Sequence, residues 1–276
     1  HHLALGVETP EAQLKWKRRL EDAGVPVTGP YDRGYFRSIY FQDPDGQILE
    51  IATRGPGYAI DEPADALGRE VIMPPQERLR GHRDEEAIRA LTHPEPVPVI
   101  EPDMTLQGIH HITGITDDIE RAHEFYESAL GLRIVKKTVN QDDGVTPHWF
   151  WARYDGAEVG PHSALTLFGW PHSNYWARGG AGQTHHIAFR AADEEEQLAW
   201  REHLLSLGVE VTPVMDRKYF KSIYFRAPDG LLLEIATDGP GFAVDEPADA
   251  LGRELKLPAW LEPRRAELEA VLTPLG

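Results

Sequence analysis

A long internal repeat constrains the fold of this chain more than any other feature. Residues 1–70 align with residues 185–254 at a constant offset of 184 positions, without a gap and with well over half of the residues identical. The blocks DRGYFRSIYFQDPDGQILEIATRGPG and DRKYFKSIYFRAPDGLLLEIATDGPG match along their whole length, and DEPADALGRE occurs twice unchanged. Repeats of this kind encode copies of one structural unit, so the chain contains the same module at least twice.

Each copy reads as a strand, a helix and three further strands. In the first copy, Thr9 as N-cap and Pro10 in the first turn open a helix that Gly24 ends. The alternating segments YFRSIYF and QILEIAT, separated by the turn sequence DPDG, follow as strands. Residues 109–169 repeat this order with HHITGI, a helix, and the strands LRIVKKTV, HWFWARY and SALTLFGW. We therefore predict an α+β fold of three βαβββ modules.

The composition favours a small-molecule ligand. A formal net charge of -17 would repel nucleic acid and anionic membranes. The sequence has no cysteine, which excludes disulfides, zinc–thiolate sites and cysteine nucleophiles, and leaves His, Asp and Glu as the strong metal ligands. It also lacks an apolar run long enough to span a membrane. We expect a cytoplasmic protein that binds neither nucleic acid nor membranes; the sequence leaves open whether it forms a homo-oligomer.

Three strands begin with two adjacent histidines, at His1, His110 and His185. Side chains alternate between the two faces of a strand. The second histidine of a doublet therefore faces away from the apolar residues beside it, and so does the glutamate of LEIAT in the last strand. This alternation places imidazoles and a carboxylate on the inner face and apolar side chains towards the helix.

Tandem βαβββ modules that carry HHIT and LEIAT resemble the vicinal oxygen chelate superfamily, which includes glyoxalase I, bleomycin-resistance proteins and extradiol dioxygenases. Over nearly the whole chain, the ordered set HHITGI, LGLRIVKKTVNQDD, HHIAF, DRKYFKSIYF and LLLEIATDGPGF is most similar to the ring-cleaving hydroquinone dioxygenases. The resemblance implies open β-barrels with helices outside. It also implies a first domain over residues 1–103, with one module and a linker helix, and a second over residues 104–276, with two modules and a tail.

In that family, the second histidine of a doublet and the glutamate of the last strand bind the metal. The resemblance implies this role for His2, Glu50, His111, His186 and Glu234. Two imidazoles and one carboxylate form the facial triad that binds Fe(II) and leaves positions for substrate oxygens and O2, and Mn(II) suits the same triad. The implied function is an Fe(II)-dependent extradiol-type dioxygenase that acts with O2 on a small phenolic substrate, a hydroquinone or a catechol, in the catabolism of aromatic compounds.

Other family positions surround the metal and its substrate. The resemblance implies catalytic or supporting roles for His1, Arg33, Tyr40, His110, Thr113, His185, Arg217 and Tyr224. Tyr224 and Glu234 lie symmetrically about Asp229 in the hairpin RAPDGL, so we expect them as cross-strand neighbours. Arg217 suits an anionic phenolate or ring-opened product.

Structural explanations compete with these roles. Arg33 and Arg217 can form salt bridges at strand ends. Tyr224 can pack in the core, and His186 can form a buried hydrogen-bonded pair with Glu234. A tag remnant would also begin with histidines, but HHLAL keeps register with HHIAF. His148, His162 and His172 lie near strand ends or in loops, where we expect exposure to solvent.

Two other functions share this fold. A glyoxalase-type isomerase or lyase would take a carboxylate from the last strand of both modules, but SALTLFGW has none. A bleomycin-resistance type of binding protein needs no metal, so it would have no reason to keep His and Glu in two copies. A measurement of bound metal separates that case.

Three modules leave one set of ligands without a partner, because a barrel of this type closes two modules around one metal. The pairing is either His111 with His186 and Glu234, or His2 and Glu50 with His111, and we favour the second. The chain has no initiating Met and starts inside a first strand. We therefore expect a longer protein with another HHIT-like strand roughly 75 residues before His2. The segment from Gly57 to Asp103 and its counterpart, the C-terminal tail PAWLEPRRAELEAVLTPLG, are expected as straps on the surface.

Overall fold

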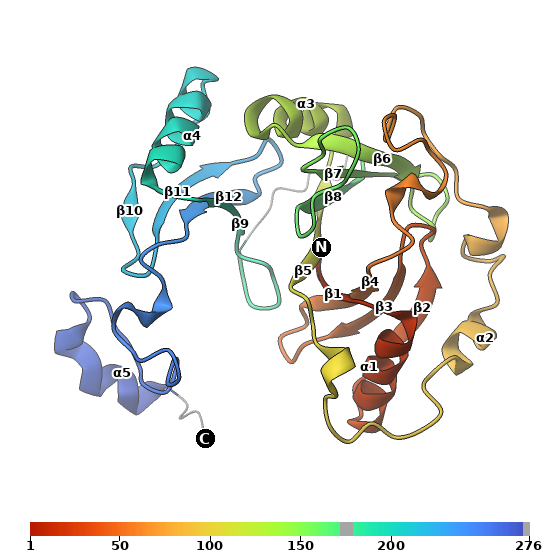
Figure 1. The fold of residues 1–276 in the computed structure, drawn as a ribbon, viewed down its shortest axis with the longest axis horizontal. Coiled ribbons are helices and arrows are strands. Elements are labelled where there is room, and N and C mark those ends of the chain that lie inside the picture. The colour runs from red at the N-terminus through yellow and green to blue at the C-terminus, as the bar shows by residue number, and fades with distance from the viewer. Residues whose placement is uncertain (172–178, 273–276) are drawn as a thin grey trace. The chain divides into compact units, whose positions relative to one another are not determined.

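The computed structural model describes residues 1–171 and 179–272, and the chain divides into two compact units. The first unit comprises His1–Ile187 and Arg226–Leu232, and the second comprises Ala188–Phe225 and Leu233–Gly276. Figure 1 shows the mixture of strands and helices in both, and the α+β class predicted from the sequence is confirmed. The boundary expected between residues 103 and 104 falls inside the first unit, and the division into two domains stays a prediction.

The first module has the predicted βαβββ order. Its elements are β1 (His2–Val7), α1 (Pro10–Asp22), β2 (Thr28–Asp32), β3 (Arg37–Gln42) and β4 (Ile48–Thr53). The Thr9 hydroxyl accepts a hydrogen bond from the backbone N–H of Ala12, and Pro10 occupies the first turn of α1. Gly24 has a φ of 78°, a conformation that suits glycine after a helix end. The expected limits of this helix are confirmed.

The central module repeats this order. Its elements are β5 (Ile109–Thr116), α3 (Ile119–Leu130), β6 (Arg133–Val139), β7 (Pro147–Ala152) and β8 (Ala164–Gly169). Asp118 caps α3 by accepting from the N–H of Arg121, and Gly131 ends the helix in the left-handed conformation. Helix α3 packs against β6, β7 and β8, as α1 packs against β1, β3 and β4.

One eight-stranded sheet joins these two modules, in the order β2-β3-β4-β1-β5-β8-β7-β6. The seam is the antiparallel pair β1–β5, in which His2 lies opposite Thr113 and Ala4 lies opposite His111. His2 and His111 hold the same position in their modules, so the seam relates the two modules by an approximate twofold axis. This symmetry brings the second histidines of two doublets together, in the pairing that the sequence analysis favoured.

A hydrophobic cluster built from both modules supports the seam. It contains Ala4, Tyr35, Phe36, Ala52, Leu67, Val135, Phe150 and Ala152, all of them buried. Leu67 comes from the first copy of DEPADALGRE, in the segment that was expected as a surface strap. That expectation is wrong for part of the segment, because Asp61 and Glu62 also bind the buried ammonium of Lys136 on β6.

The rest of this connecting segment is largely exposed. It contains the short helices η1 (Tyr58–Ile60), η2 (Gln76–Arg78), α2 (Glu85–Ala90) and η3 (Pro102–Met104). No helix among residues 1–171 and 179–272 is long and apolar enough to cross a bilayer.

The third module follows the same order along the chain. Its elements are β9 (Ile187–Ala191), α4 (Glu194–Ser206), β10 (Met215–Asp216), β11 (Lys221–Arg226) and β12 (Leu232–Thr237), and its sheet has the order β10-β11-β12-β9. The short helices η4 (Phe242–Val244), η5 (Glu262–Arg264) and α5 (Arg265–Val271) follow. Gln197 on α4 donates to the carbonyl of Ile235 at 2.7 Å, as Gln13 on α1 donates to that of Ile51 at 2.7 Å. The repeat therefore extends to individual buried hydrogen bonds.

Candidate metal centre

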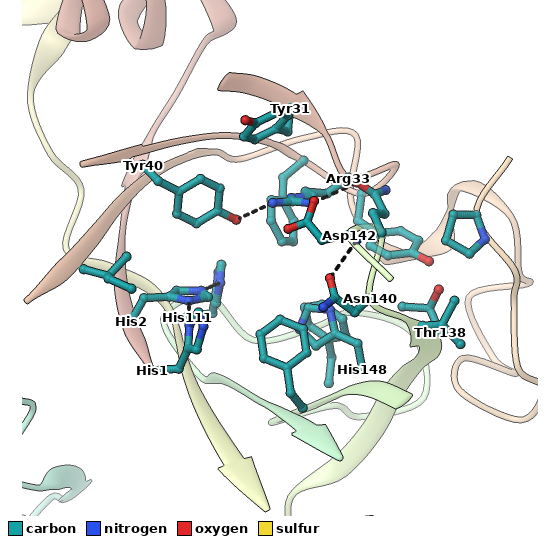
Figure 2. A pocket seen from close by; sticks show the side chains of 18 of the residues that line it. His1, His2, Tyr31, Arg33, Tyr40, His111, Thr138, Asn140, Asp142 and His148 are labelled. Atoms are coloured by element: carbon teal, nitrogen blue, oxygen red, sulfur yellow. Dashed lines mark hydrogen bonds between the residues drawn. The ribbon is translucent and has the colours of Figure 1, made fainter. Parts of the chain in front are cut away.

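An aromatic pocket of about 390 Å³ opens beside the seam in the first unit (Figure 2). Its walls include Phe36, Phe150, Phe168, Trp170 and three tyrosines, Tyr31, Tyr35 and Tyr40. Polar groups gather at a few points on this wall, among them the imidazoles of His2 and His111 and the guanidinium of Arg33. A concave, mostly apolar site with a few convergent polar groups is the usual form of a small-molecule site.

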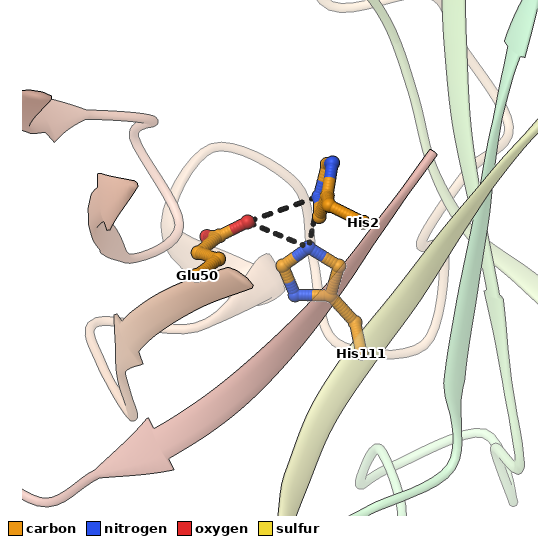
Figure 3. A group of neighbouring side chains, drawn as sticks. All are labelled: His2, Glu50 and His111. Atoms are coloured by element: carbon orange, nitrogen blue, oxygen red, sulfur yellow. Dashed lines mark hydrogen bonds and ion pairs between the residues drawn. The ribbon is translucent and has the colours of Figure 1, made fainter. Parts of the chain in front are cut away.

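His2, Glu50 and His111 meet where β1, β4 and β5 run side by side (Figure 3). The Nε2 atom of His2 lies 3.0 Å from Glu50 Oε2, and the Nε2 atom of His111 lies 3.3 Å from the same oxygen. The two nitrogens are 3.3 Å apart. All three residues are buried, so three potential ligand atoms face one another out of contact with bulk solvent.

The hydrogen bonding at this cluster fits a metal. Glu50 Oε1 accepts a hydrogen bond from the Ser38 hydroxyl. Glu50 Oε2 is buried, and it makes no well-aligned hydrogen bond with any group among the residues that the structure describes. His2 Nε2 has the Thr113 hydroxyl 2.7 Å away as well as Glu50 and His111. One ring nitrogen makes a single bond in its plane, so these contacts cannot all be hydrogen bonds at once. A divalent cation bound between the two Nε2 atoms and Glu50 Oε2 would accept a lone pair from all three at once.

Each histidine doublet has the same internal contact. Nδ1 of the first ring lies close to Nδ1 of the second, at 2.6 Å for His1–His2, 2.8 Å for His110–His111 and 2.9 Å for His185–His186. When the second ring donates through Nδ1, its Nε2 carries a lone pair and is available as a ligand. A first histidine that accepts this bond orients the second ring and holds it in that tautomer.

Protonation states in the cluster favour metal binding. Burial lowers the pKa of His2 to about 4, which keeps this imidazole neutral at physiological pH. Burial by itself would raise the pKa of Glu50, but the imidazoles of His111 and His2 hold it well below its usual value. Burial, followed by the neighbouring His111, lowers the pKa of His110 to about 3. A neutral imidazole beside an ionised carboxylate is the form in which these groups bind a cation.

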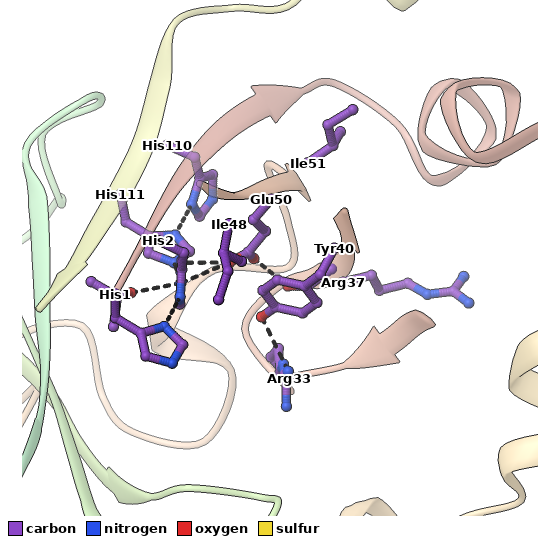
Figure 4. A network of polar contacts seen from close by, with 12 residues as sticks. His1, His2, Arg33, Arg37, Tyr40, Ile48, Glu50, Ile51, His110 and His111 are labelled. Carbon is purple, nitrogen blue, oxygen red and sulfur yellow. Dashed lines mark hydrogen bonds and ion pairs between the residues drawn. The ribbon is translucent and has the colours of Figure 1, made fainter. Parts of the chain in front are cut away.

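Arg33 and Tyr40 extend this polar network towards the pocket (Figure 4). Tyr40 lies opposite Glu50 in the β3–β4 register, the first-copy counterpart of the neighbours predicted for Tyr224 and Glu234. The Arg33 guanidinium donates to the Tyr40 hydroxyl at 3.1 Å and lies over the ring at 5.3 Å from its centroid. Burial raises the pKa of Tyr40 above its ordinary value, so the hydroxyl stays protonated.

The position of His148 differs from the sequence expectation. His148 was expected in solvent near a strand end, but it lines the pocket from β7 and its Nε2 is buried. Strand alternation could have located it, because His148 and Phe150 are two residues apart and face the same side. His162 is exposed as expected, whereas His172 lies outside the described residues.

The central module offers no second carboxylate to this cluster. Glu50 on β4 lies opposite Ala4, the residue two positions after His2 on β1. At the corresponding position on β8, opposite Thr113, stands Thr166. Its hydroxyl is buried and makes no hydrogen bond to any part of the chain described here. Among the described residues, the cluster therefore offers three strong potential metal ligands rather than four.

The corresponding residues of the second repeat fall in both units. His185 and His186 belong to the first unit, and Arg217, Tyr224 and Glu234 belong to the second. Arg217 lies over the ring of Tyr224 at 5.2 Å, and the Ser222 hydroxyl donates to Glu234, as their counterparts do in the first copy. Their joint role at a metal stays a prediction.

A family model for the "Glyoxalase/Bleomycin resistance protein/Dioxygenase superfamily" matches residues 1–51 and 108–235. The chain belongs to this superfamily. The "Putative ring-cleaving dioxygenase MhqO" of Bacillus subtilis is 33% identical over 266 residues, which cover 95% of this chain and 69% of that protein. The "Putative ring-cleaving dioxygenase MhqA" of the same organism is 34% identical over 278 residues, which cover 99% of this chain and 75% of that protein.

A third relative is the "Chlorohydroquinone/hydroquinone 1,2-dioxygenase" of Sphingobium indicum, 32% identical over 176 residues, or 62% of this chain and 50% of that protein. Among solved structures, a "putative dioxygenase" from Bacillus subtilis matches with a TM-score of 0.70 and 30% identity, over 99% of this chain and 73% of the other. Glyoxalase I from Zea mays matches with a TM-score of 0.52 and 18% identity, over 86% and 67% of the two chains, and shows the shared fold. The names of the relatives support a dioxygenase.

Proposed function

We propose that the protein is an extradiol-type ring-cleaving dioxygenase that uses Fe(II), held by His2, Glu50 and His111, to open the ring of a hydroquinone or catechol with O2. The observation that carries this proposal is the convergence of Glu50 Oε2 with the Nε2 atoms of two buried imidazoles, at 3.0 and 3.3 Å, beside an aromatic pocket. Two neutral nitrogens and one carboxylate oxygen form the donor set of non-haem Fe(II) oxygenases, and Mn(II) is the alternative metal.

When bound, the metal would supply sites for a phenolic oxygen and O2 and let electrons pass between them. The other steps fall to side chains. Arg33 lines the pocket with a permanent positive charge, which suits a phenolate or an anionic product. Tyr40 keeps its proton and can donate a hydrogen bond to an oxygen of the substrate. Phe36, Phe150 and Phe168 exclude water and fit an aromatic ring.

His1, His110 and Thr113 act on the ligands in this proposal. The two first histidines orient the metal-binding rings through Nδ1, and the Thr113 hydroxyl lies against His2. By repeat, His186 and Glu234 would bind a metal with a histidine from another HHIT-type module. His185, Arg217 and Tyr224 would then support that second centre.

Thr166 argues against the isomerase alternative. A glyoxalase-type centre with a carboxylate from each module would need an acidic residue at this position of β8. A binding protein without metal does not explain why three potential metal-ligating atoms converge in the buried seam, since burying a carboxylate is unfavourable. Both alternatives therefore account for fewer of the features at the seam.

Elemental analysis of Glu50→Gln tests the metal site. The substitution preserves shape but removes the anionic ligand, so we expect the iron or manganese held at the seam to be lost. A Glu50→Gln, Glu234→Gln double variant extends the test to both repeats. Asp229→Asn is the matched control, because it neutralises another buried carboxylate of the first unit. Undiminished metal in the double variant would refute the proposal, and O2 uptake over a panel of catechols and hydroquinones then identifies the substrate.

A further inference from the structure

His148 is held in a fixed orientation in the pocket wall. Its ring stacks on Phe168 with centroids 4.1 Å apart and lies 4.4 Å from the ring of Phe150. Phe168 in turn stacks on Trp170 at 5.2 Å. The ring is therefore positioned by packing rather than by a local hydrogen bond, and it presents its polar edge at a defined place.

A second feature of His148 is the state of its Nε2 atom. It is buried, and it makes no hydrogen bond to any residue in the described ranges 1–171 and 179–272. Buried polar atoms are nearly always paired, because leaving one without a partner is unfavourable. An unpaired nitrogen on the wall of a pocket is best explained by a partner on the molecule that enters it.

The charge state of His148 limits what this partner can be. Burial lowers the pKa of His148 well below its usual value, and the positive charge of Arg33 lowers it further. The imidazole is therefore neutral at physiological pH. A neutral ring forms a hydrogen bond with a hydroxyl, as donor or acceptor, and offers no cation to a carboxylate.

We infer that His148 recognises a second hydroxyl on the ring of a phenolic substrate, an inference that rests on the proposed function. One phenolic oxygen would lie at the triad, whose residues His2 and His111 line the pocket. His148 lies apart from these two histidines on the pocket wall (Figure 2). It therefore suits a hydroxyl on the far side of the ring, so the pocket selects hydroquinones over phenols with an apolar group there.

A pair of ligands isolates this contact. Hydroquinone and 4-methylphenol have similar size and differ in one group, a hydroxyl replaced by a methyl. We would measure both dissociation constants by calorimetry on the full chain loaded anaerobically with Fe(II), so that no turnover is needed. We expect wild type to prefer hydroquinone by about 10-fold, and His148→Leu to lose this preference without losing affinity for 4-methylphenol.

Two further variants serve as controls. His148→Asn keeps a hydrogen-bonding group and should retain part of the preference, and it replaces the Leu variant should that one fail to fold. Phe36→Leu removes an aromatic wall residue other than the two that hold the His148 ring, and it should weaken both ligands equally. An unchanged preference in both His148 variants would overturn the inference, as would a failure of wild type to discriminate or to bind either phenol. Equal affinities with and without Fe(II) would instead contradict the metal role in the proposed function.

Discussion

At the scale of single residues, the centre depends on side chains that come in adjacent pairs along the chain. His2 and His111 provide Nε2 at the seam, while His1 and His110 contact the opposite nitrogen of each ring. A strand sends neighbouring side chains to opposite faces, so the first histidine turns back towards the second to make this contact. In the proposed centre, two adjacent residues therefore provide both a metal ligand and its support, which accounts for the recurrence of the doublets at the start of strands.

Tyr40→Phe tests whether the hydroxyl beside Glu50 takes part in the reaction. The variant removes the group that meets Arg33 and that burial keeps protonated. We expect its metal content to match wild type and its turnover on the best phenolic substrate to fall by about 100-fold or more, a typical contribution of acid–base catalysis. O2 uptake and elemental analysis on the same sample provide the comparison.

Tyr31→Phe is the control for this variant, because Tyr31 also lies under the Arg33 guanidinium. The central carbon of that guanidinium is 5.2 Å from the centroid of the Tyr31 ring. Full turnover in Tyr40→Phe would remove the tyrosine from the mechanism. A fall of the same size in both variants would point instead to the placement of Arg33.

The sequence predicted the residues of the candidate centre better than it predicted the pocket around them. The doublets and LEIAT stand out because they recur in register, and the triad His2, Glu50 and His111 comes from those motifs. Thr166 and His148 had no such signal, since each occurs in one module and acquires its significance only when the seam forms. Which side of a pocket a lone histidine faces depends on strand pairing over long distances.

At the scale of elements, the segment after β4 is fixed to the central module by charge. The ammonium of Lys136 on β6 is fully buried, binds both Asp61 and Glu62, and lies 4.9 Å from the ring centroid of Tyr35. Glu62 also accepts from the backbone N–H of Gly68 at 3.0 Å. The sequence placed strands and helices correctly from alternation and capping. It assigned this segment to the surface because loops of polar composition usually lie there.

Lys136→Met should destabilise the protein strongly. Removal of one partner from a buried ion pair leaves the other charges without compensation, which costs about 3–5 kcal/mol in comparable cases. The adjacent Lys137→Met is the matched control, because the Lys137 ammonium lies over Trp149 at 4.5 Å, a contact worth about 0.5–1 kcal/mol. Urea unfolding gives both free energies, and similar small losses in the two variants would show that Asp61 and Glu62 need no partner.

At the scale of the whole molecule, one repeated sequence occurs in two different environments. In the first copy, Leu67 of DEPADALGRE is 5% exposed and packs in the cluster shared with the central module. In the second copy, the identical Leu251 is 44% exposed, and Phe242 is 63% exposed where the first copy has the half-buried Tyr58. The repeat fixes the module itself, whereas burial of its outer face depends on a neighbouring module, which no single copy encodes.

Leu67→Ala and Leu251→Ala measure this difference with the same substitution in the same decapeptide. Truncation of the buried Leu67 removes contacts with the cluster and leaves a cavity, so we expect a loss of about 2–5 kcal/mol in the free energy of unfolding. Leu251 is exposed, so its truncation removes few packing contacts. We expect it to lower the free energy of unfolding by no more than about 0.5 kcal/mol, the range of surface substitutions. Urea denaturation followed by circular dichroism compares the two. A large loss for Leu251→Ala would mean that this face is covered in solution, because truncation of a side chain is costly only where other atoms pack against it.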